Sequence, residues 1–350
     1  GTVLLTNHII MKRNRLINLF VLAFGASAFL MMPGCSKEGP AGPAGSDGTP
    51  GVAGNAVCME CHNLDKKAEV NDQYMESQHG EGEFVGYAGG RNSCAKCHSD
   101  QGFKETQYTG QDTTIANISL PQPVQCETCH DFHETLDFSM GADYALRTND
   151  PVDLLMYRAA DPDAPAVTLD LDPSSNLCAN CHQPRRVGPV DDGTGMFTVT
   201  STHYGPHHGP QSLTLGGFGA YELGTGYPAP GTGGMHVEKA GCTTCHMHDG
   251  NHSMNVTLEG CNTSKCHNGS ITTFENNNRQ MQVAALLTTL ETKLTDAGLI
   301  LDGHPNPGTY PVDEVGALYN YEWVLDDRSM GVHNFQYIET LLNNSIAVFP

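Results

Sequence analysis

Residues 242–246 read Cys242-Thr-Thr-Cys245-His246, and this spacing of two cysteines and a histidine recurs along the chain. The pattern C-x-x-C-H occurs five times, and a sixth copy is stretched to four intervening residues. A shuffled chain of this composition would contain on the order of 0.02 such motifs, so the repetition calls for a chemical explanation. The six copies are Cys58, Cys61 and His62; Cys94, Cys97 and His98; Cys126, Cys129 and His130; Cys178, Cys181 and His182; Cys242, Cys245 and His246; and Cys261, Cys266 and His267.

Each copy has the spacing needed to attach a c-type haem. Two thiols add to the vinyl groups on one edge of the porphyrin, and the adjacent histidine reaches the iron. Four intervening residues also occur in known c-type cytochromes, so the stretched copy joins the set. We therefore predict a multihaem c-type cytochrome with six haem c groups, held by the twelve motif cysteines with the six motif histidines as proximal ligands.

Two other interpretations use the same cysteines. Zinc ribbons join C-x-x-C pairs in fours around a tetrahedral metal. A disulfide framework suits an exported chain rich in cysteine. Neither requires a histidine directly after each cysteine pair, so haem attachment is the preferred interpretation.

The composition agrees with a core that side chains fill only in part. The chain has 350 residues, of which 39% are hydrophobic and 7% aromatic. This is lean for a core of that length, and six large apolar macrocycles would fill it. The net charge of -21 argues against nucleic acid or an anionic membrane surface as a partner and favours a cationic one.

The first 34 residues are predicted to be a start-site artefact followed by a signal peptide. Translation is expected to begin at Met11. A basic stretch follows Met11, and the apolar stretch Leu16–Met32 comes next. The sequence Met-Pro-Gly-Cys35 resembles a lipobox, which implies a lipid-modified Cys35. Ser36 replaces the Asp that usually retains such lipoproteins at the inner membrane, so the resemblance implies an exported outer-membrane lipoprotein facing the periplasm or the cell surface. A transmembrane anchor is the alternative.

Residues 35–57 are predicted to form the lipid-anchored start and a collagen-like tether. Glycine stands at every third position from Gly39 to Gly54. An extended stalk is preferred because six Gly-X-Y triplets are few for a stable triple helix. A collagen-like triple helix that trimerises the protein is the alternative. A structural or adhesive role for the protein has only this stretch in its support.

Histidines outside the motifs are candidates for the second axial position of each iron. His79 lies in a Ser-x-His segment that resembles the distal-ligand segments of multihaem cytochromes. In the segment 202–211, His208 is preferred and His203 comes next, with His207 as a third candidate. His248 and His304 are expected to be ordinary polar residues, and methionine ligation is an alternative. The distal candidates are His79, His133, His208, His203, His236, His252 and His333.

The expected fold is mainly α and irregular, organised by haems, with little β-sheet. Residues 58–270 are predicted to form the hexahaem domain, with loops rich in glycine and proline, such as 216–234. Residues 271–350 are predicted to form a C-terminal helical segment that packs on the haems. Helical periodicity predicts helices over 278–297, 315–325 and 335–347.

Short segments around His79, Cys242–His252 and Gly331–Tyr337 resemble the multihaem nitrite reductase and hydroxylamine oxidoreductase superfamily. No C-x-x-C-K motif is present, although nitrite reductases of that group commonly use lysine at the catalytic haem. An acidic loop containing Asp161 and Asp163, followed by Asp170 and Asp172, lacks an EF-hand pattern and is expected to be solvated rather than to bind calcium.

The favoured function is electron transfer at the cell envelope or outer surface through mostly bis-histidine haems, and not enzyme catalysis. The expected partners are redox proteins, an extracellular acceptor or further copies in a homo-oligomer or filament. Membrane contact would run through the lipid anchor. The alternative is a reductase or oxidase of a small nitrogen or sulfur compound with one open haem.

Overall fold

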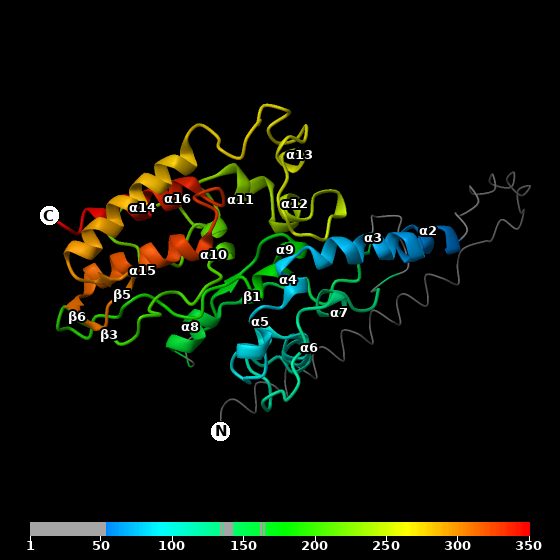
Figure 1. The fold of residues 1–350 in the computed structure, drawn as a ribbon, viewed down its shortest axis with the longest axis horizontal. Coiled ribbons are helices and arrows are strands. Elements are labelled where there is room, and N and C mark those ends of the chain that lie inside the picture. The colour runs from blue at the N-terminus through cyan, green and yellow to red at the C-terminus, as the bar shows by residue number, and fades with distance from the viewer. Residues whose placement is uncertain (1–53, 134, 136–142, 162, 164) are drawn as a thin grey trace, which may run out of the picture. The chain divides into compact units, whose positions relative to one another are not determined.

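The structure is a computed structural model, and it describes residues 54–350 apart from 134, 136–142, 162 and 164 (Figure 1). The predicted signal peptide, the lipid-modified Cys35 and the Gly-X-Y triplets up to residue 53 lie outside the described residues. The chain divides into two compact units, Gly1–Cys58 and Met59–Pro350.

The region that holds the attachment motifs consists of short helices joined by irregular segments. Side chains cap several of these helices; for example, Ser99 accepts the N–H of Gly102 at the start of α6. The predicted irregular stretch 216–234 is confirmed. In chain order the elements are α2 (Gly54–His62), α3 (Leu64–Met75), α4 (Gln78–Glu81), the π-helical turn η2 (Val85–Gly89), α5 (Ala95–His98), α6 (Asp100–Thr109), α7 (Cys126–Cys129), α8 (Leu155–Ala160), α9 (Pro173–Ala179), α10 (Gln211–Gly216), α11 (Met235–Lys239), α12 (Cys242–His246), the 3-10 turn η3 (His248–Gly250) and α13 (Leu258–Cys261).

The β-structure of the described residues is limited to short antiparallel pairs. The longest pair joins a loop after the fourth motif to the loop between the C-terminal helices, with Met196 opposite Pro311 and Val199 opposite Gly308. The prediction of a mainly α and irregular fold with little β-sheet is confirmed. The pairs are β1 (Val152–Asp153) with β2 (Thr168–Leu169), β3 (Met196–Val199) with β6 (Gly308–Pro311), and β4 (Ile300–Leu301) with β5 (His304–Pro305).

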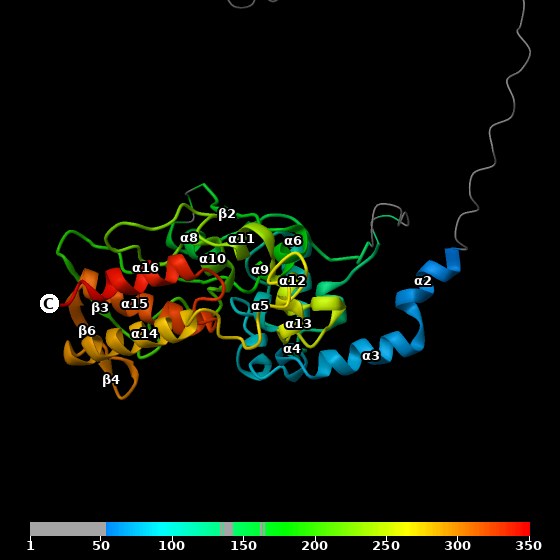
Figure 2. The ribbon, with the colours of Figure 1, turned by 90° about the horizontal axis from the view of Figure 1, so that it is seen from above.

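Three long helices close the chain and confirm the helices predicted from periodicity: α14 (Arg279–Asp296), α15 (Val312–Asp327) and α16 (Phe335–Ile346). They lie side by side in both views (Figures 1 and 2). The buried residues of α14 recur at helical spacing, from Val283 to Leu294. None of the helices in the described part of the chain is long and apolar enough to cross a membrane.

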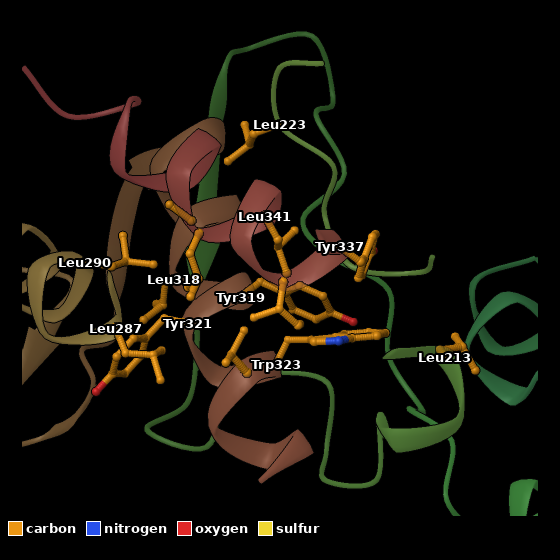
Figure 3. Close-up of a cluster of buried hydrophobic side chains, with 14 of the residues drawn as sticks. Leu213, Leu223, Leu287, Leu290, Leu318, Tyr319, Tyr321, Trp323, Tyr337 and Leu341 are labelled. Atoms are coloured by element: carbon orange, nitrogen blue, oxygen red, sulfur yellow. The ribbon is translucent and has the colours of Figure 1, made fainter. Parts of the chain in front are cut away.

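The apolar core lies among these three helices and the segments that reach them from the motif region (Figure 3). Trp323 is fully buried, and its indole N–H donates to Thr214 Oγ1 at 2.9 Å. The hydroxyl of Tyr319 donates to the backbone carbonyl of Arg186 at 2.5 Å. These two bonds fix α15 to the segments around the fourth motif.

Candidate functional site

We number the six attachment motifs as sites 1 to 6 in chain order. In the five standard copies the cysteines lie on or at the end of a helical turn. Residues three apart share one face of a helix, so both thiols of a motif lie on the same side. In three sites the histidine N–H closes the turn onto the carbonyl of the first cysteine: His98 to Cys94 at 3.2 Å, His130 to Cys126 at 2.9 Å and His182 to Cys178 at 3.0 Å.

The stretched copy at site 6 ends in the same hydrogen bond. The N–H of His267 donates to the carbonyl of Cys261 at 3.1 Å. A tight turn takes up the two extra residues, because the N–H of Cys266 donates to the carbonyl of Thr263 at 3.0 Å. Despite the longer spacing, the histidine N–H therefore bonds to the carbonyl of the first cysteine, as it does at sites 2, 3 and 4.

The cysteine arrangement bears on the two other interpretations. All twelve motif cysteines are free thiols, whereas a disulfide framework would pair them. A zinc ribbon needs four ligands around one metal. In the described part of the chain, no three His, Cys, Asp or Glu side chains converge as a metal cluster would require.

The motif histidines are instead arranged in pairs with the predicted distal histidines. Five of the six each face one further histidine ring that comes from a distant part of the sequence. The pairs, with the distance between ring centroids, are His62 and His133 at 6.0 Å, His130 and His252 at 6.2 Å, His182 and His79 at 6.0 Å, His246 and His333 at 6.4 Å, and His267 and His236 at 6.2 Å.

This spacing fits one iron between each pair of rings. An imidazole nitrogen lies about 2.0 Å from its metal, and the ring centre lies about 1.1 Å beyond that nitrogen. Two imidazoles on opposite sides of one iron therefore have centroids about 6.2 Å apart. The five observed distances lie within a few tenths of an ångström of this value, so the residues present fit a bis-histidine haem at sites 1, 3, 4, 5 and 6.

Hydrogen bonds at Nδ1 leave the other ring nitrogen available as a ligand. A carbonyl oxygen can only accept, so a ring nitrogen bonded to one must carry the hydrogen. The opposite nitrogen, Nε2, then keeps the lone pair that binds a metal. This arrangement holds for His130 with Tyr144 O at 2.7 Å, His246 with Met254 O at 2.9 Å, His236 with Val332 O at 2.6 Å and His252 with Gly250 O at 2.8 Å.

His333 is held by a carboxylate instead of a carbonyl. Its Nδ1 lies 2.7 Å from Asp327 Oδ1, and the Asp327 side chain is 0% exposed. Burial pulls the pKa of His333 down, but the charge of Asp327 and the hydrogen bond to it outweigh burial and raise it.

Site 2 differs from the other five. The ring of His98 packs edge-on against Phe84, with centroids 6.5 Å apart, and not against a histidine at the spacing of the other sites. His207 and His208 lie nearby, because His208 contributes to lowering the pKa of His98, after burial and Arg185. Among the described residues, the motif histidine of site 2 therefore has no histidine ring facing it at this spacing.

The ring of His208 is oriented by a carboxylate, as the ring of His333 is. Its Nδ1 lies 2.7 Å from Asp326 Oδ1, and its backbone N–H donates to Asp326 Oδ2 at 3.1 Å. The φ angles of His207 and His208 are +71° and +50°, a left-handed conformation that side chains rarely adopt. Two strained residues in a row indicate that the segment is held in a set position.

The remaining histidines of interest lie apart from the pairs. His203 is exposed and contacts Arg186 and Ser201 through its backbone. His304 is exposed on β5. His248 lies 3.5 Å from the Asp249 carboxylate.

Two aspartates of the acidic loop form hydrogen bonds near site 4. Asp172 accepts the N–H of Ser175 and so caps α9, the helix that carries Cys178. Asp170 accepts the side-chain amide of Asn176 at 3.0 Å.

Site 4 is packed directly against both site 2 and site 5. Cys97 Sγ of site 2 lies 3.9 Å from the carbonyl of Asn180, and Cys181 Sγ of site 4 lies 3.8 Å from the carbonyl of Lys96. The two motifs thus contact each other reciprocally. Site 4 meets site 5 through α9 and α12, where Ser175 Oγ accepts the N–H of Cys242 at 2.7 Å.

Sites 5, 6, 3 and 1 are linked by segments that each carry residues of two sites. Val332, whose carbonyl holds His236 of site 6, precedes His333 of site 5. His252 of site 3 follows the site 5 motif by a few residues. His133 of site 1 follows His130 of site 3 by three residues. Shared segments therefore connect all six sites.

The two histidines paired at site 4 both have lowered pKa values. Burial lowers the pKa of His182 to about 4 and also lowers the pKa of His79. Both rings are therefore neutral at neutral pH, which is the form that binds iron. At site 1, Cys58, Cys61 and His62 are exposed.

Sequence reasoning missed the groups that orient the histidines. Asp326 and Asp327 stand close ahead of His333 in the sequence, and this proximity was the one available signal for Asp327. No sequence pattern indicated the carbonyl partners of the other histidines, since any residue supplies a carbonyl.

No family model and no curated protein sequence matches the chain. Among solved structures, the chain is similar to the crystal structure of the outer cell wall cytochrome OcwA, with a TM-score of 0.45 and 20% sequence identity. The alignment covers 78% of this chain and 48% of that chain, so this chain spans about half the length of OcwA.

Proposed function

We propose that the protein is an electron carrier that holds six haem c groups, one at each attachment motif. The observation that supports this most strongly is the set of five histidine pairs with ring centroids 6.0–6.4 Å apart. A haem closed by two histidines supplies one-electron redox chemistry without binding a substrate. The protein positions the irons and tunes their potentials.

The second axial ligand at site 2 is proposed to be His208. The support is its orientation by Asp326, which matches that of His333 by Asp327. His208 also lies close enough to His98 to contribute to lowering its pKa, after burial and Arg185. The distal set is then His133, His208, His252, His79, His333 and His236 for sites 1 to 6.

The packing of the motifs supports a continuous route for electrons. The contacts link site 1 to site 3, site 3 to site 5, and site 5 to both site 4 and site 6, with site 2 attached to site 4. We propose sites 1 and 6 as the ends of the route. Electrons would then enter and leave at these two ends.

The cellular setting is proposed from the sequence. Export and a lipid-modified Cys35 would place the protein at the outer membrane, facing the periplasm or the cell surface. The net charge of -21 favours a redox partner with a cationic surface. An extracellular acceptor or a further copy in an oligomer or filament are the other proposed acceptors.

A second candidate function is a multihaem reductase or oxidase of a small nitrogen or sulfur compound. One observation favours it: the His98 ring faces Phe84, which would leave the iron of site 2 open. The five closed sites make electron transfer the preferred function.

The test is electron counting on the purified, haem-loaded chain. We expect the fully reduced protein to give up six electrons to an artificial acceptor, and nitrite or hydroxylamine not to be turned over. Sustained turnover of either compound, lost in a Cys94→Ala/Cys97→Ala variant, would contradict the carrier and establish the enzyme.

A further inference from the structure

The Asp327 carboxylate is a buried charge at the C-terminal end of α15. One oxygen accepts the Nδ1–H of His333 at 2.7 Å. The other accepts the backbone N–H of Ser329 at 3.3 Å and also the Ser329 hydroxyl. Because both oxygens are engaged, the carboxylate is fixed against one edge of the His333 ring.

This position is unfavourable for an acid in itself. The C-terminus of a helix carries a partial negative charge, which repels carboxylates. A buried charge also loses its hydration. The last turn of α15 contains no basic residue, yet both Asp326 and Asp327 lie there. The hydrogen-bond partners that offset this cost include one histidine each, His208 for Asp326 and His333 for Asp327.

A carboxylate acts on a haem through the histidine that it holds. An imidazole that donates its Nδ1–H to a carboxylate is a more basic ligand than one that donates to a carbonyl. A ferric haem with two neutral histidines carries one net positive charge at the iron, and the ferrous form carries none. The negative charge therefore stabilises the oxidised form more than the reduced form.

We propose that Asp327 lowers the reduction potential of site 5 and that Asp326 does the same at site 2. The inference rests on the proposed haem function. In each couple the iron takes up one electron from the reductant, and no bond forms or breaks. Sites 3 and 6, whose distal histidines His252 and His236 donate to carbonyls, lack this effect.

Sites 2 and 5 both adjoin site 4. Site 2 contacts the site 4 motif through Cys97, and site 5 contacts α9, the helix that carries this motif, through Cys242. Lower reduction potentials at sites 2 and 5 would favour site 4 for an electron that reaches these three haems.

The experiment compares the full-length, haem-loaded protein with three single variants. Asp327→Asn and Asp326→Asn each remove a carboxylate beside a distal histidine. Asp313→Asn, at the exposed start of the same helix, removes the same charge elsewhere. The readouts are a redox titration followed by absorbance and by low-spin electron paramagnetic resonance, together with the haem count by mass.

Asp327→Asn is expected to make reduction of one haem about tenfold more favourable at a fixed potential, which is about 59 mV for a one-electron couple. Asp326→Asn is expected to shift a different haem upward, and Asp313→Asn none. Unchanged potentials in both variants with six haems retained would overturn the inference. Fewer than six haems in the unaltered protein would overturn the proposed function instead. If Asp327→Asn does not fold, Asp326→Asn alone tests the inference, because Asp326 lies nearer the surface.

Discussion

The imidazole ring is the smallest unit on which the account depends. Each ring needs its Nε2 aimed at an iron, and a single hydrogen bond at Nδ1 is enough to fix that direction. The backbone supplies this bond for His130, His246, His236 and His252. For these four histidines, the direction of the ring is therefore set by backbone carbonyls, which any residue can provide.

Replacing a distal histidine should open one iron. In His252→Ala we expect the haem at site 3 to stay attached through Cys126 and Cys129, but to become high-spin and to bind one carbon monoxide per chain. The measurement is electron paramagnetic resonance with a carbon monoxide titration. His304→Ala, at an exposed histidine on β5, is the matched control and should behave as the unaltered protein. An unchanged spin state in His252→Ala would remove His252 from the ligand set.

The Glu322 carboxyl predicts a pH dependence of stability. Burial, and after it the charge of the neighbouring Asp326, raise its pKa to about 7, although His208 opposes them. An acid whose pKa is raised on folding binds a proton as the chain folds. Its contribution to stability is therefore full below its unfolded pKa and is lost as pH rises toward 7.

Glu322→Gln should remove this loss. We expect the variant to gain thermal stability relative to the unaltered protein on going from pH 5 to pH 8, as measured by unfolding midpoints at both values. Glu339→Gln on α16 serves as the control. Equal pH profiles for the unaltered protein and Glu322→Gln would show that Glu322 titrates normally.

Residue-level prediction from sequence was uneven for a physical reason. The attachment residues are fixed by covalent spacing within one turn, so the motif alone specifies them. A distal ligand is defined by which distant segment folds against the motif, as with His79 and His182. The sequence named the candidate histidines, but their pairing required the fold.

At the scale of elements, the contact of α9 with α12 is the closest join between two attachment sites. Asp172 and Ser175 at the start of α9 lie directly against Gly241, which precedes α12. A Cβ at Gly241 would lie 1.7 Å from Asp172 Oδ2 and 2.3 Å from Ser175 Oγ. Only a glycine allows this approach, since any side chain would overlap the helix cap.

Gly241→Ala should therefore separate sites 4 and 5. Overpacking of this kind costs about 1–3 kcal/mol, and we expect a lower unfolding midpoint and altered low-spin signals at two haems. Gly86→Ala is the matched control, since a Cβ there meets nothing within 4 Å. A Gly241→Ala variant as stable as Gly86→Ala would contradict the close packing of α9 on α12.

The three C-terminal helices were predictable, whereas the short elements were not. Apolar residues of α14 and α16 recur at helical spacing because one face of each helix packs on a core. The pair β3 and β6 joins residues 196–199 to 308–311, and so depends on contacts across more than a hundred residues. Such pairings leave no local pattern in the sequence.

At the scale of the whole molecule, the six motifs form one connected group instead of separate sites. The order in space differs from the order in sequence, because His133 and His252 each serve a motif other than the nearest one in the chain. The sequence shows how many motifs there are, and the fold is needed to see which of them lie next to one another. The division into residues 58–270 and 271–350 stays a prediction.

The stretched motif tests the number of haems. In Cys261→Ala/Cys266→Ala we expect the loss of one haem, so that the mass corresponds to five. Cys35, upstream of the motifs, offers the control: Cys35→Ser should keep all six. A double variant with an unchanged haem mass would exclude site 6 from the set.

Closure of all six haems by two histidines each can be checked by counting spins. Electron paramagnetic resonance is measured on the oxidised, purified protein, with the haem count determined on the same sample. We expect six ferric haems per chain, all low-spin. A high-spin signal equal to one haem per chain would show that one iron is open, and site 2, where His98 faces Phe84, would be the first site to examine.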